Sequence, residues 1–219
     1  MKIAITGHSS GIGRSLDTIL DLTTDYEIRG YSKSNGWNIA KEDGEQIINE
    51  LIDYDPDVLF NNAYYPKIQN KICETLYTKW SNQDKIIINT GSISGYLAEM
   101  LGDDESDYIN DKKQMSEFCI KSSFNYPWNN RTRIYNISFG FVDTPLVTNT
   151  SRPINVDNMI DTDDAAHMLI DLMDDKSYHI VEQVVNCNFT EVNEMQNHFR
   201  AATRNVLKHI VRSNKEIKD

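Results

Sequence analysis

Short apolar runs alternate with longer amphipathic stretches along most of the chain, and this alternation limits the fold more than any other feature. The run at residues 2–6 has the length and composition of a buried strand, and residues 13–22 repeat their apolar side chains at helical spacing. The other expected strands are 27–31, 57–61, 85–89, 133–138 and 182–186, and the other expected helices are 44–54, 68–80, 107–122, 163–173 and 191–210. Strands joined through helices form a parallel sheet that is covered on both faces. We therefore expect one three-layer, doubly wound α/β domain that spans residues 1–219.

The charge balance argues against two classes of partner. The 219 residues include 33 acidic and 22 basic side chains, which gives a net charge of −11. Such a surface repels phosphate backbones and anionic lipid headgroups, so we expect neither nucleic acid nor a membrane as a partner. The chain has no apolar run near the roughly 20 residues of a membrane span, and it does not begin like a signal peptide. Its three cysteines form no C-x-x-C pair and its histidines have no ligand spacing, so we expect a cytoplasmic protein with free thiols and no metal centre.

The loop after the first expected strand has the composition of a phosphate-binding turn. Residues 6–13 are Thr-Gly-His-Ser-Ser-Gly-Ile-Gly, and they lead directly into a helix. Glycines let the backbone turn sharply and approach a pyrophosphate, which the helix N-terminus then stabilises. The same residues match the G-x-S-x-G elbow of α/β-hydrolases, but that elbow needs earlier strands to supply an oxyanion loop. The loop therefore favours a dinucleotide that is held by backbone amides.

Tyr108 and Lys112 form a second candidate feature, because residues four positions apart share one face of a helix. A phenol with a pKa of about 10 exchanges protons poorly near neutrality. An ammonium one turn away favours the phenolate and lowers that pKa. We therefore expect Tyr108 to act as a general acid or base.

Five segments in order resemble motifs of the short-chain dehydrogenase/reductase family. The glycine loop has the family's spacing T-G-x-x-x-G-x-G, and residues 61–64, Asn-Asn-Ala-Tyr, resemble N-N-A-G. Residues 87–92 resemble the strand that ends in the catalytic serine, and residues 108–112 match Y-x-x-x-K. Residues 139–145 resemble the segment P-G-x-x-x-T. The resemblance covers nearly the whole chain and implies a Rossmann fold.

The chain departs from the family pattern at three places. Tyr64 stands where the family has its last glycine, and Phe139 stands where it has proline. Tyr108 follows Ser92 by 16 positions, a few more than the family norm. The acidic insert at residues 102–107 accounts for the difference, and we expect it to form a flexible lip of the site.

The resemblance implies catalytic roles for four residues. Tyr108 would exchange a proton with the substrate oxygen while hydride passes between nicotinamide and carbon, and Ser92 would orient that oxygen. Lys112 would also hydrogen-bond the nicotinamide ribose, and Asn70 would anchor a proton-relay water. The expected cofactor-binding residues are Gly7, Ser9, Ser10, Gly11, Ile12, Gly13, Ser32, Lys33, Asn38, Ile39, Asn61, Asn62, Ala63, Tyr108, Lys112, Gly140, Val142 and Thr144.

The end of the second expected strand favours NADP over NAD. NAD enzymes place a carboxylate there to bind the ribose hydroxyls, and residues 30–34 contain none. Ser32 and Lys33 instead offer partners for a 2′-phosphate, with Arg14 or Arg29 as further cations.

We therefore expect an NADP-dependent oxidoreductase that acts on a small carbonyl or secondary alcohol. The resemblance implies a homodimer or homotetramer formed through the helices that carry Asn70 and Tyr108. Two alternatives remain open: a catalytically idle NADP-binding redox sensor, and a nucleotide-sugar epimerase, whose usual carboxyl-terminal domain 219 residues barely allow. The expected lining of the substrate pocket is aromatic and apolar: Tyr64, Tyr65, Tyr96, Phe141, Leu146 and Val147.

Overall fold

A parallel sheet forms the centre of the fold in the computed structural model, which describes residues 1–96, 107–125, 131–148, 159–174 and 182–185. Its strands, in the order β2-β1-β3-β4-β5-β6 across the sheet, all pair in parallel. Their bounds are β1 (Lys2–Thr6), β2 (Glu27–Tyr31), β3 (Val58–Asn61), β4 (Ile86–Ser92), β5 (Arg133–Phe139) and β6 (Glu182–Val185). The order reverses between β1 and β3, and ligands of open parallel sheets bind beyond such a point.

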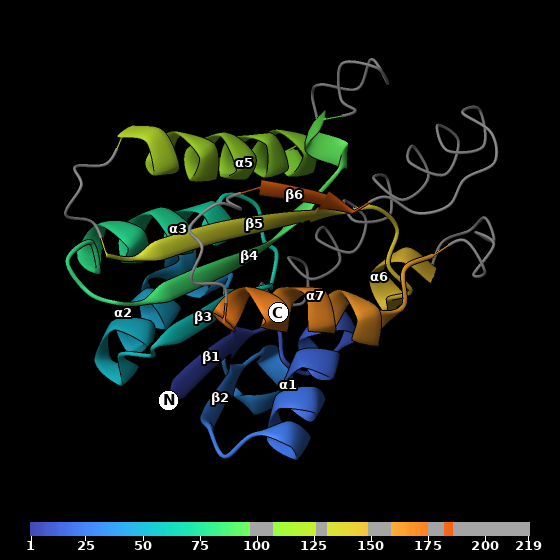
Figure 1. Ribbon diagram of the computed structural model, residues 1–219, viewed down its shortest axis with the longest axis horizontal. Coiled ribbons are helices and arrows are strands. Elements are labelled where there is room, and N and C mark those ends of the chain that lie inside the picture. The colour runs from blue at the N-terminus through green and yellow to red at the C-terminus, as the bar shows by residue number, and fades with distance from the viewer. Residues whose placement is uncertain (97–106, 126–130, 149–158, 175–181, 186–219) are drawn as a thin grey trace.

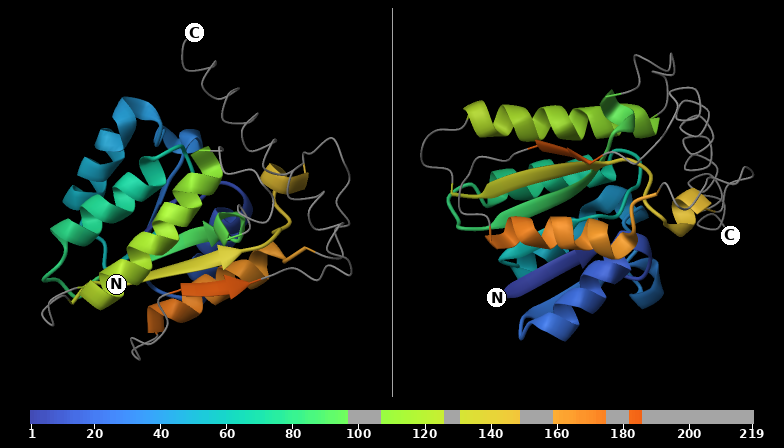
Figure 2. Two further views of the ribbon diagram at one scale, coloured as in Figure 1. Left: turned by 90° about the horizontal axis from the view of Figure 1, so that it is seen from above. Right: turned by 45° about the vertical axis from the view of Figure 1, so that its right-hand side comes forward.

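Helices cover both faces of the sheet, so the predicted three-layer doubly wound fold is confirmed (Figure 1). The helices α1 (Gly11–Thr23) and α7 (Thr162–Asp174) lie on one face. On the other face lie α2 (Glu45–Tyr54), α3 (Ile68–Lys79) and α5 (Asp107–Asn125), as Figure 2 shows. The short elements are η1 (Lys33–Asn35), η2 (Lys41–Gly44) and α6 (Pro145–Thr148). The expected helix at residues 191–210 lies outside the described residues.

Each central strand sends its apolar side chains alternately into two separate cores. Ile3 and Ile5 of β1 join the core under α1 and α7, whereas Ala4 joins the core under α2, α3 and α5. In β4, Ile86 and Ile88 likewise face one core and Ile87 the other. Burial on both faces explains why these strands are continuous apolar runs.

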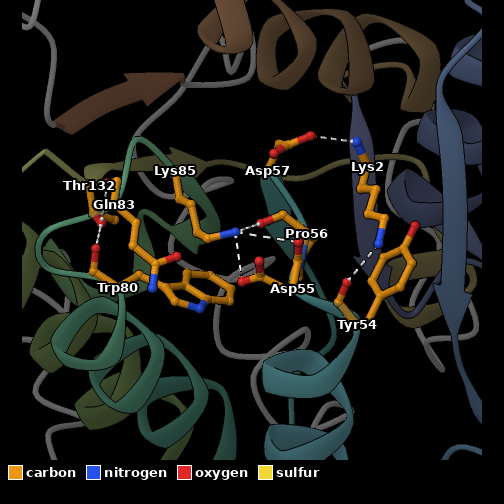
Figure 3. A network of polar contacts seen from close by, with 9 residues as sticks. All are labelled: Lys2, Tyr54, Asp55, Pro56, Asp57, Trp80, Gln83, Lys85 and Thr132. Atoms are coloured by element: carbon orange, nitrogen blue, oxygen red, sulfur yellow. Dashed lines mark hydrogen bonds and ion pairs between the residues drawn. The ribbon is translucent and has the colours of Figure 1, made fainter.

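A polar network ties together the end of the sheet opposite the carboxyl ends of the strands (Figure 3). The Lys85 ammonium donates to the Pro56 carbonyl at 2.8 Å, pairs with Asp55 at 2.8 Å, and lies 5.3 Å from the centre of the Trp80 ring. Thr132 donates to the Trp80 carbonyl from the turn before β5. Because a buried ammonium needs such partners, this lysine has a structural role.

Two further expectations concern helices and thiols. None of the helices in the described ranges is long and apolar enough to cross a membrane. Cys73 and Cys119 are free and buried, as predicted, and Cys187 lies outside the described residues.

Candidate active site

A cavity of about 460 Å³ opens at the carboxyl ends of the strands, where the strand order reverses. It is lined by the loops that follow β1, β2, β3, β4 and β5 together with the start of α5. Most of the predicted site residues line it: Gly7, Ser9, Ser10, Gly11, Ile12, Ser32, Lys33, Asn38, Ile39, Asn62, Ala63, Ser92, Tyr108, Lys112, Gly140, Val142 and Thr144. Segments that are up to 140 residues apart in the sequence therefore meet in one cavity.

The glycine loop has the geometry of an anion cradle. Gly7 and Gly11 have left-handed backbones, with φ of +74° and +51°, which glycine adopts without strain. A Cβ on Gly13 would lie 2.2 Å from the carbonyl oxygen of Gly7, so the loop and α1 approach each other too closely for any side chain. Ser10, the N-cap residue of α1, makes no side-chain capping bond, and the first turn contains no acidic residue. The first backbone N–H groups of α1 therefore remain available to an anion.

Threonine and asparagine side chains join the glycine loop to the loop after β3. The Thr6 hydroxyl accepts hydrogen bonds from the backbone N–H groups of Asn62 and Ala63, both at 2.9 Å. Asn62 donates to the Thr6 carbonyl and accepts from the Thr90 hydroxyl at 3.1 Å. The Asn-Asn-Ala segment thus connects the first, third and fourth strands beneath the cavity.

The cavity is basic although the protein is acidic. Its charged lining residues, within the described part of the chain, are Lys33 and Lys112, and no carboxylate lines it. Ser32 is buried at the end of β2, where its hydroxyl lies 2.7 Å from that of Ser34. The structure thus places a serine and a lysine where a dinucleotide site for NAD carries an acid. These residues, the glycine cradle and the size of the cavity fit a phosphorylated dinucleotide.

Tyr108 and Lys112 project from the first turns of α5 into the same cavity as Ser92. The Lys112 Nζ lies 5.6 Å from the centre of the Tyr108 ring. The hydroxyls of Ser92 and Ser94 are 2.8 Å apart, and both hydrogen-bond to Tyr108. The expected serine, tyrosine and lysine are therefore adjacent. Ser94 was not predicted, and its position two residues after Ser92 is the only sequence signal for it.

The pKa of Tyr108 moves in the opposite direction to the one expected. Burial raises it above its ordinary value, and the hydrogen bonds with Ser92 and Ser94 oppose that rise only in part. Lys112 is itself buried, and desolvation lowers the pKa of its ammonium to about 7, although Asp111 favours the charged form. A lysine that loses part of its protons near neutral pH stabilises phenolate less than the fully charged ammonium that the helical spacing alone suggests.

Protein oxygens hold the Lys112 ammonium. It donates to Gln69 Oε1 and to the Thr90 carbonyl, each at 2.7 Å. The centre of the Tyr64 ring lies 5.3 Å from its Nζ. Gln69 was not predicted from the sequence.

Three predicted site residues do not line the cavity. Gly13 lies behind the glycine loop, where it permits the close approach to Gly7. Asn61 is fully buried, and its amide donates to the Gln69 carbonyl and to Asn89. Asn70 donates to the Asp111 carbonyl at 2.9 Å from α3, and its buried Oδ1 has no hydrogen-bond partner among the described residues. These three residues therefore pack behind the residues that line the cavity.

Tyr64, which replaces the family's glycine, packs against the predicted catalytic tyrosine. The two rings meet edge to face, with centroids 4.8 Å apart and planes at 83°. The Tyr64 hydroxyl donates to Asp111 at 3.0 Å, and burial together with that carboxylate raises its pKa. Of the other expected pocket residues, Leu146 and Val147 line the cavity, whereas Tyr65, Tyr96 and Phe141 do not. Residues 102–106 of the acidic insert lie outside the described residues.

Comparisons with known proteins agree on the fold. No family model and no curated protein matches the sequence. The structure is similar to 3-alpha-hydroxysteroid dehydrogenase from a Pseudomonas species in complex with NADH, with a TM-score of 0.67, 18% identity, and coverage of 85% of this chain and 95% of that one. It is also similar to a short-chain dehydrogenase from Burkholderia cenocepacia in complex with NADP. The TM-score is 0.62 at 15% identity, and the match covers 95% of this chain and 96% of that one.

A third similar structure is a small-chain dehydrogenase in complex with NADPH, with a TM-score of 0.59, 14% identity, and coverage of 85% of this chain and 95% of that one. The chain therefore has the Rossmann-type fold of the short-chain dehydrogenases/reductases.

Proposed function

We propose that this protein is an NADP-dependent oxidoreductase of the short-chain dehydrogenase/reductase type, which acts on a small carbonyl or secondary alcohol. One observation carries the proposal: a single cavity joins a glycine cradle at a helix N-terminus to an adjacent serine, tyrosine and lysine. The similar structures that are complexed with NADH, NADP or NADPH support a nicotinamide cofactor.

The preference for NADP rests on the end of β2. Lys33 and the buried Ser32 line the cavity there, and no carboxylate of the described residues competes for a ribose hydroxyl. A lysine attracts a 2′-phosphate, whereas a carboxylate would repel it. The backbone N–H groups at the start of α1 would hold the pyrophosphate.

The protein's own residues handle the proton. A nicotinamide bound in the cavity would supply or accept the hydride. In the reducing direction, the Tyr108 hydroxyl donates its proton to the carbonyl oxygen as that oxygen gains charge, and in the oxidising direction the phenolate takes the proton back. Ser92 donates a hydrogen bond to the same oxygen, and Lys112 stabilises the phenolate that remains on Tyr108.

The raised pKa of Tyr108 has a consequence for the direction of the reaction. A phenol that keeps its proton at neutral pH is ready to act as an acid, so reduction needs no prior change of protonation. Oxidation needs the phenolate and therefore improves as the pH rises.

Turnover with and without the phenolic hydroxyl tests the proposal. We expect the wild-type protein to oxidise NADPH in the presence of some member of a panel of small aldehydes and ketones. Tyr108→Phe should lower kcat at least about a hundredfold, because it removes the proton donor, while the NADPH dissociation constant changes little. Tyr26→Phe is the matched control, since Tyr26 is exposed at the opposite end of β2.

The same experiment separates the enzyme from the redox sensor. A sensor would bind NADPH without oxidising it on any carbonyl of the panel, and Tyr108→Phe would then change nothing. Turnover at the wild-type rate in Tyr108→Phe would remove Tyr108 from the mechanism.

The oligomeric state and the location in the cell belong to the same proposal. We infer a homodimer or homotetramer that associates through α3 and α5, and a cytoplasmic location, from the family resemblance and the cysteine usage. Light scattering behind size-exclusion chromatography measures the first, and a monomer at micromolar concentration would contradict it.

A further inference from the structure

Gln69 is the side chain through which α3 contacts the lysine of the candidate site. Its Oε1 accepts a hydrogen bond from Lys112 Nζ at 2.7 Å, across 43 positions of sequence. Gln69 is 1% exposed and Lys112 is 4% exposed, so water does not compete for this contact.

The orientation of the Gln69 amide is set by its other partners. Its Nε2 donates to the Asn61 carbonyl at 2.7 Å and to the Thr90 carbonyl at 3.2 Å. The Asn61 side chain in turn donates to the backbone carbonyl of Gln69 at 3.0 Å. Because an amide nitrogen donates and carbonyls accept, the NH₂ group must face the two carbonyls, and the oxygen is left for Lys112.

The Lys112 ammonium depends on Gln69 Oε1 because its other surroundings offer few hydrogen-bond acceptors. Among the described residues, Nζ has two protein oxygens as hydrogen-bond acceptors, Gln69 Oε1 and the Thr90 carbonyl. The titratable groups that face it are Asp111 and Tyr108 on its own helix and Tyr64 from the loop after β3. The Asp111 carboxylate is occupied by the Tyr64 hydroxyl and the Lys67 backbone N–H. A buried ammonium that lost the Gln69 oxygen would be left with the Thr90 carbonyl.

We propose that Gln69 is a positioning residue, which holds the Lys112 ammonium beside Tyr108 and favours its protonated form. This inference rests on the proposed oxidoreductase function, and it assigns a role to a residue that touches neither substrate nor cofactor. Lys112 without its proton cannot stabilise a phenolate on Tyr108. Gln69 therefore sets the pH above which reduction declines.

The test replaces Gln69 with methionine, which is of similar length but is at most a weak acceptor. A hydrogen bond to a charged group corresponds to a shift of about one to two pH units. We expect the midpoint of the Lys112 titration to fall by that amount in Gln69→Met. The probe is the ¹³Cε resonance in protein labelled with ¹³C-lysine, identified by its loss in Lys112→Met. Gln83→Met is the control, because Gln83 is exposed at the far end of the sheet.

A second measurement uses the wild-type protein and does not depend on the folding of a Gln69 variant. The ¹³Cδ resonance of the Gln69 carboxamide should titrate with the same midpoint as Lys112, and this titration should vanish in Lys112→Met. A carboxamide resonance that does not change with pH, or a Lys112 midpoint that is equal in wild type and Gln69→Met, would overturn the inference.

Activity distinguishes this inference from the function on which it rests. In the pH profile of kcat/KM for carbonyl reduction, the alkaline limb should move to lower pH in Gln69→Met, by the same number of pH units as the midpoint of the Lys112 titration. If the wild-type protein turns over no carbonyl while both resonances titrate as expected, the proposed function is refuted. The coupling between Lys112 and Gln69 then still stands. Normal turnover with an unmoved limb refutes the coupling alone.

Discussion

Removing the Lys112 ammonium should change the stability of the protein by an amount that depends on pH. Lys112 is 4% exposed, and burial lowers its pKa from the ordinary 10.5 to about 7. Each pH unit of such lowering corresponds to about 1.4 kcal/mol, so the charged lysine costs the folded state at most about 5 kcal/mol. Lys112→Met keeps most of the apolar stem and abolishes the charge, so that cost should disappear, while the loss of the hydrogen bonds to Gln69 and Thr90 adds a cost that does not vary with pH.

The sign of the pH dependence follows from proton linkage. Below pH 7 the lysine is protonated in both the folded and the unfolded chain, so the full penalty acts on the wild type. Between about pH 7 and 10.5 the unfolded chain binds more protons than the folded one, and the wild type therefore gains stability as the pH rises. The stability of Lys112→Met relative to the wild type should thus be highest near pH 6 and should fall by about 1.4 kcal/mol per pH unit above pH 7.

Urea denaturation of the two proteins at pH 6, 7.5 and 9 measures this difference. Every other titrating group is common to both proteins, so the difference between their free energies of unfolding isolates Lys112. Lys113→Met reports the effect of removing a lysine from the exposed side of the same helix. A difference between wild type and Lys112→Met that stays constant from pH 6 to 9 would show that the folded protein does not penalise this charge.

Two further predictions concern the nucleotide site. Lys33→Ala should reduce the ratio of NADPH to NADH affinity in isothermal titration, whereas Lys41→Ala, at an exposed site outside the cavity, should leave the ratio unchanged; equal affinities in the wild type would refute the preference for NADP. Gly13→Ala should lower the dinucleotide affinity at least about tenfold and reduce Tm, because the new Cβ would lie 2.2 Å from the Gly7 carbonyl oxygen, and a variant with wild-type affinity and Tm would contradict this reading of the loop.

The sheet and its flanking helices could be predicted because burial on two faces leaves a direct trace in the sequence. Strands such as β1 and β4 are apolar throughout because successive side chains enter two different cores. The segment between β2 and α2 left no such trace. It contains η1 and η2, short polar turns that each end at a left-handed glycine, Gly36 and Gly44, and no hydrophobic period marks them.

The meeting of the site segments could also be predicted, since the carboxyl ends of parallel strands lie at one edge of the sheet. The electrostatics of the site could not. The spacing of Tyr108 and Lys112 fixes which helix face they share but not how deeply that face is buried, and burial decides the pKa of both groups. Gln69 escaped prediction because its contact with Lys112 joins two helices packed side by side, and no local pattern encodes such a contact.

The contrast between an acidic protein and a basic cavity explains why the net charge argues against some classes of ligand and not against others. At physiological ionic strength, charges on an exposed surface are screened over about 8 Å. A nucleic acid or a membrane meets many surface carboxylates at once, and their repulsion adds up over its whole footprint. A dinucleotide that enters the cavity meets the amides of α1, Lys33 and Lys112, and no carboxylate among the described lining residues. The local arrangement of these few groups, rather than the total of −11, therefore decides which phosphorylated molecule can bind.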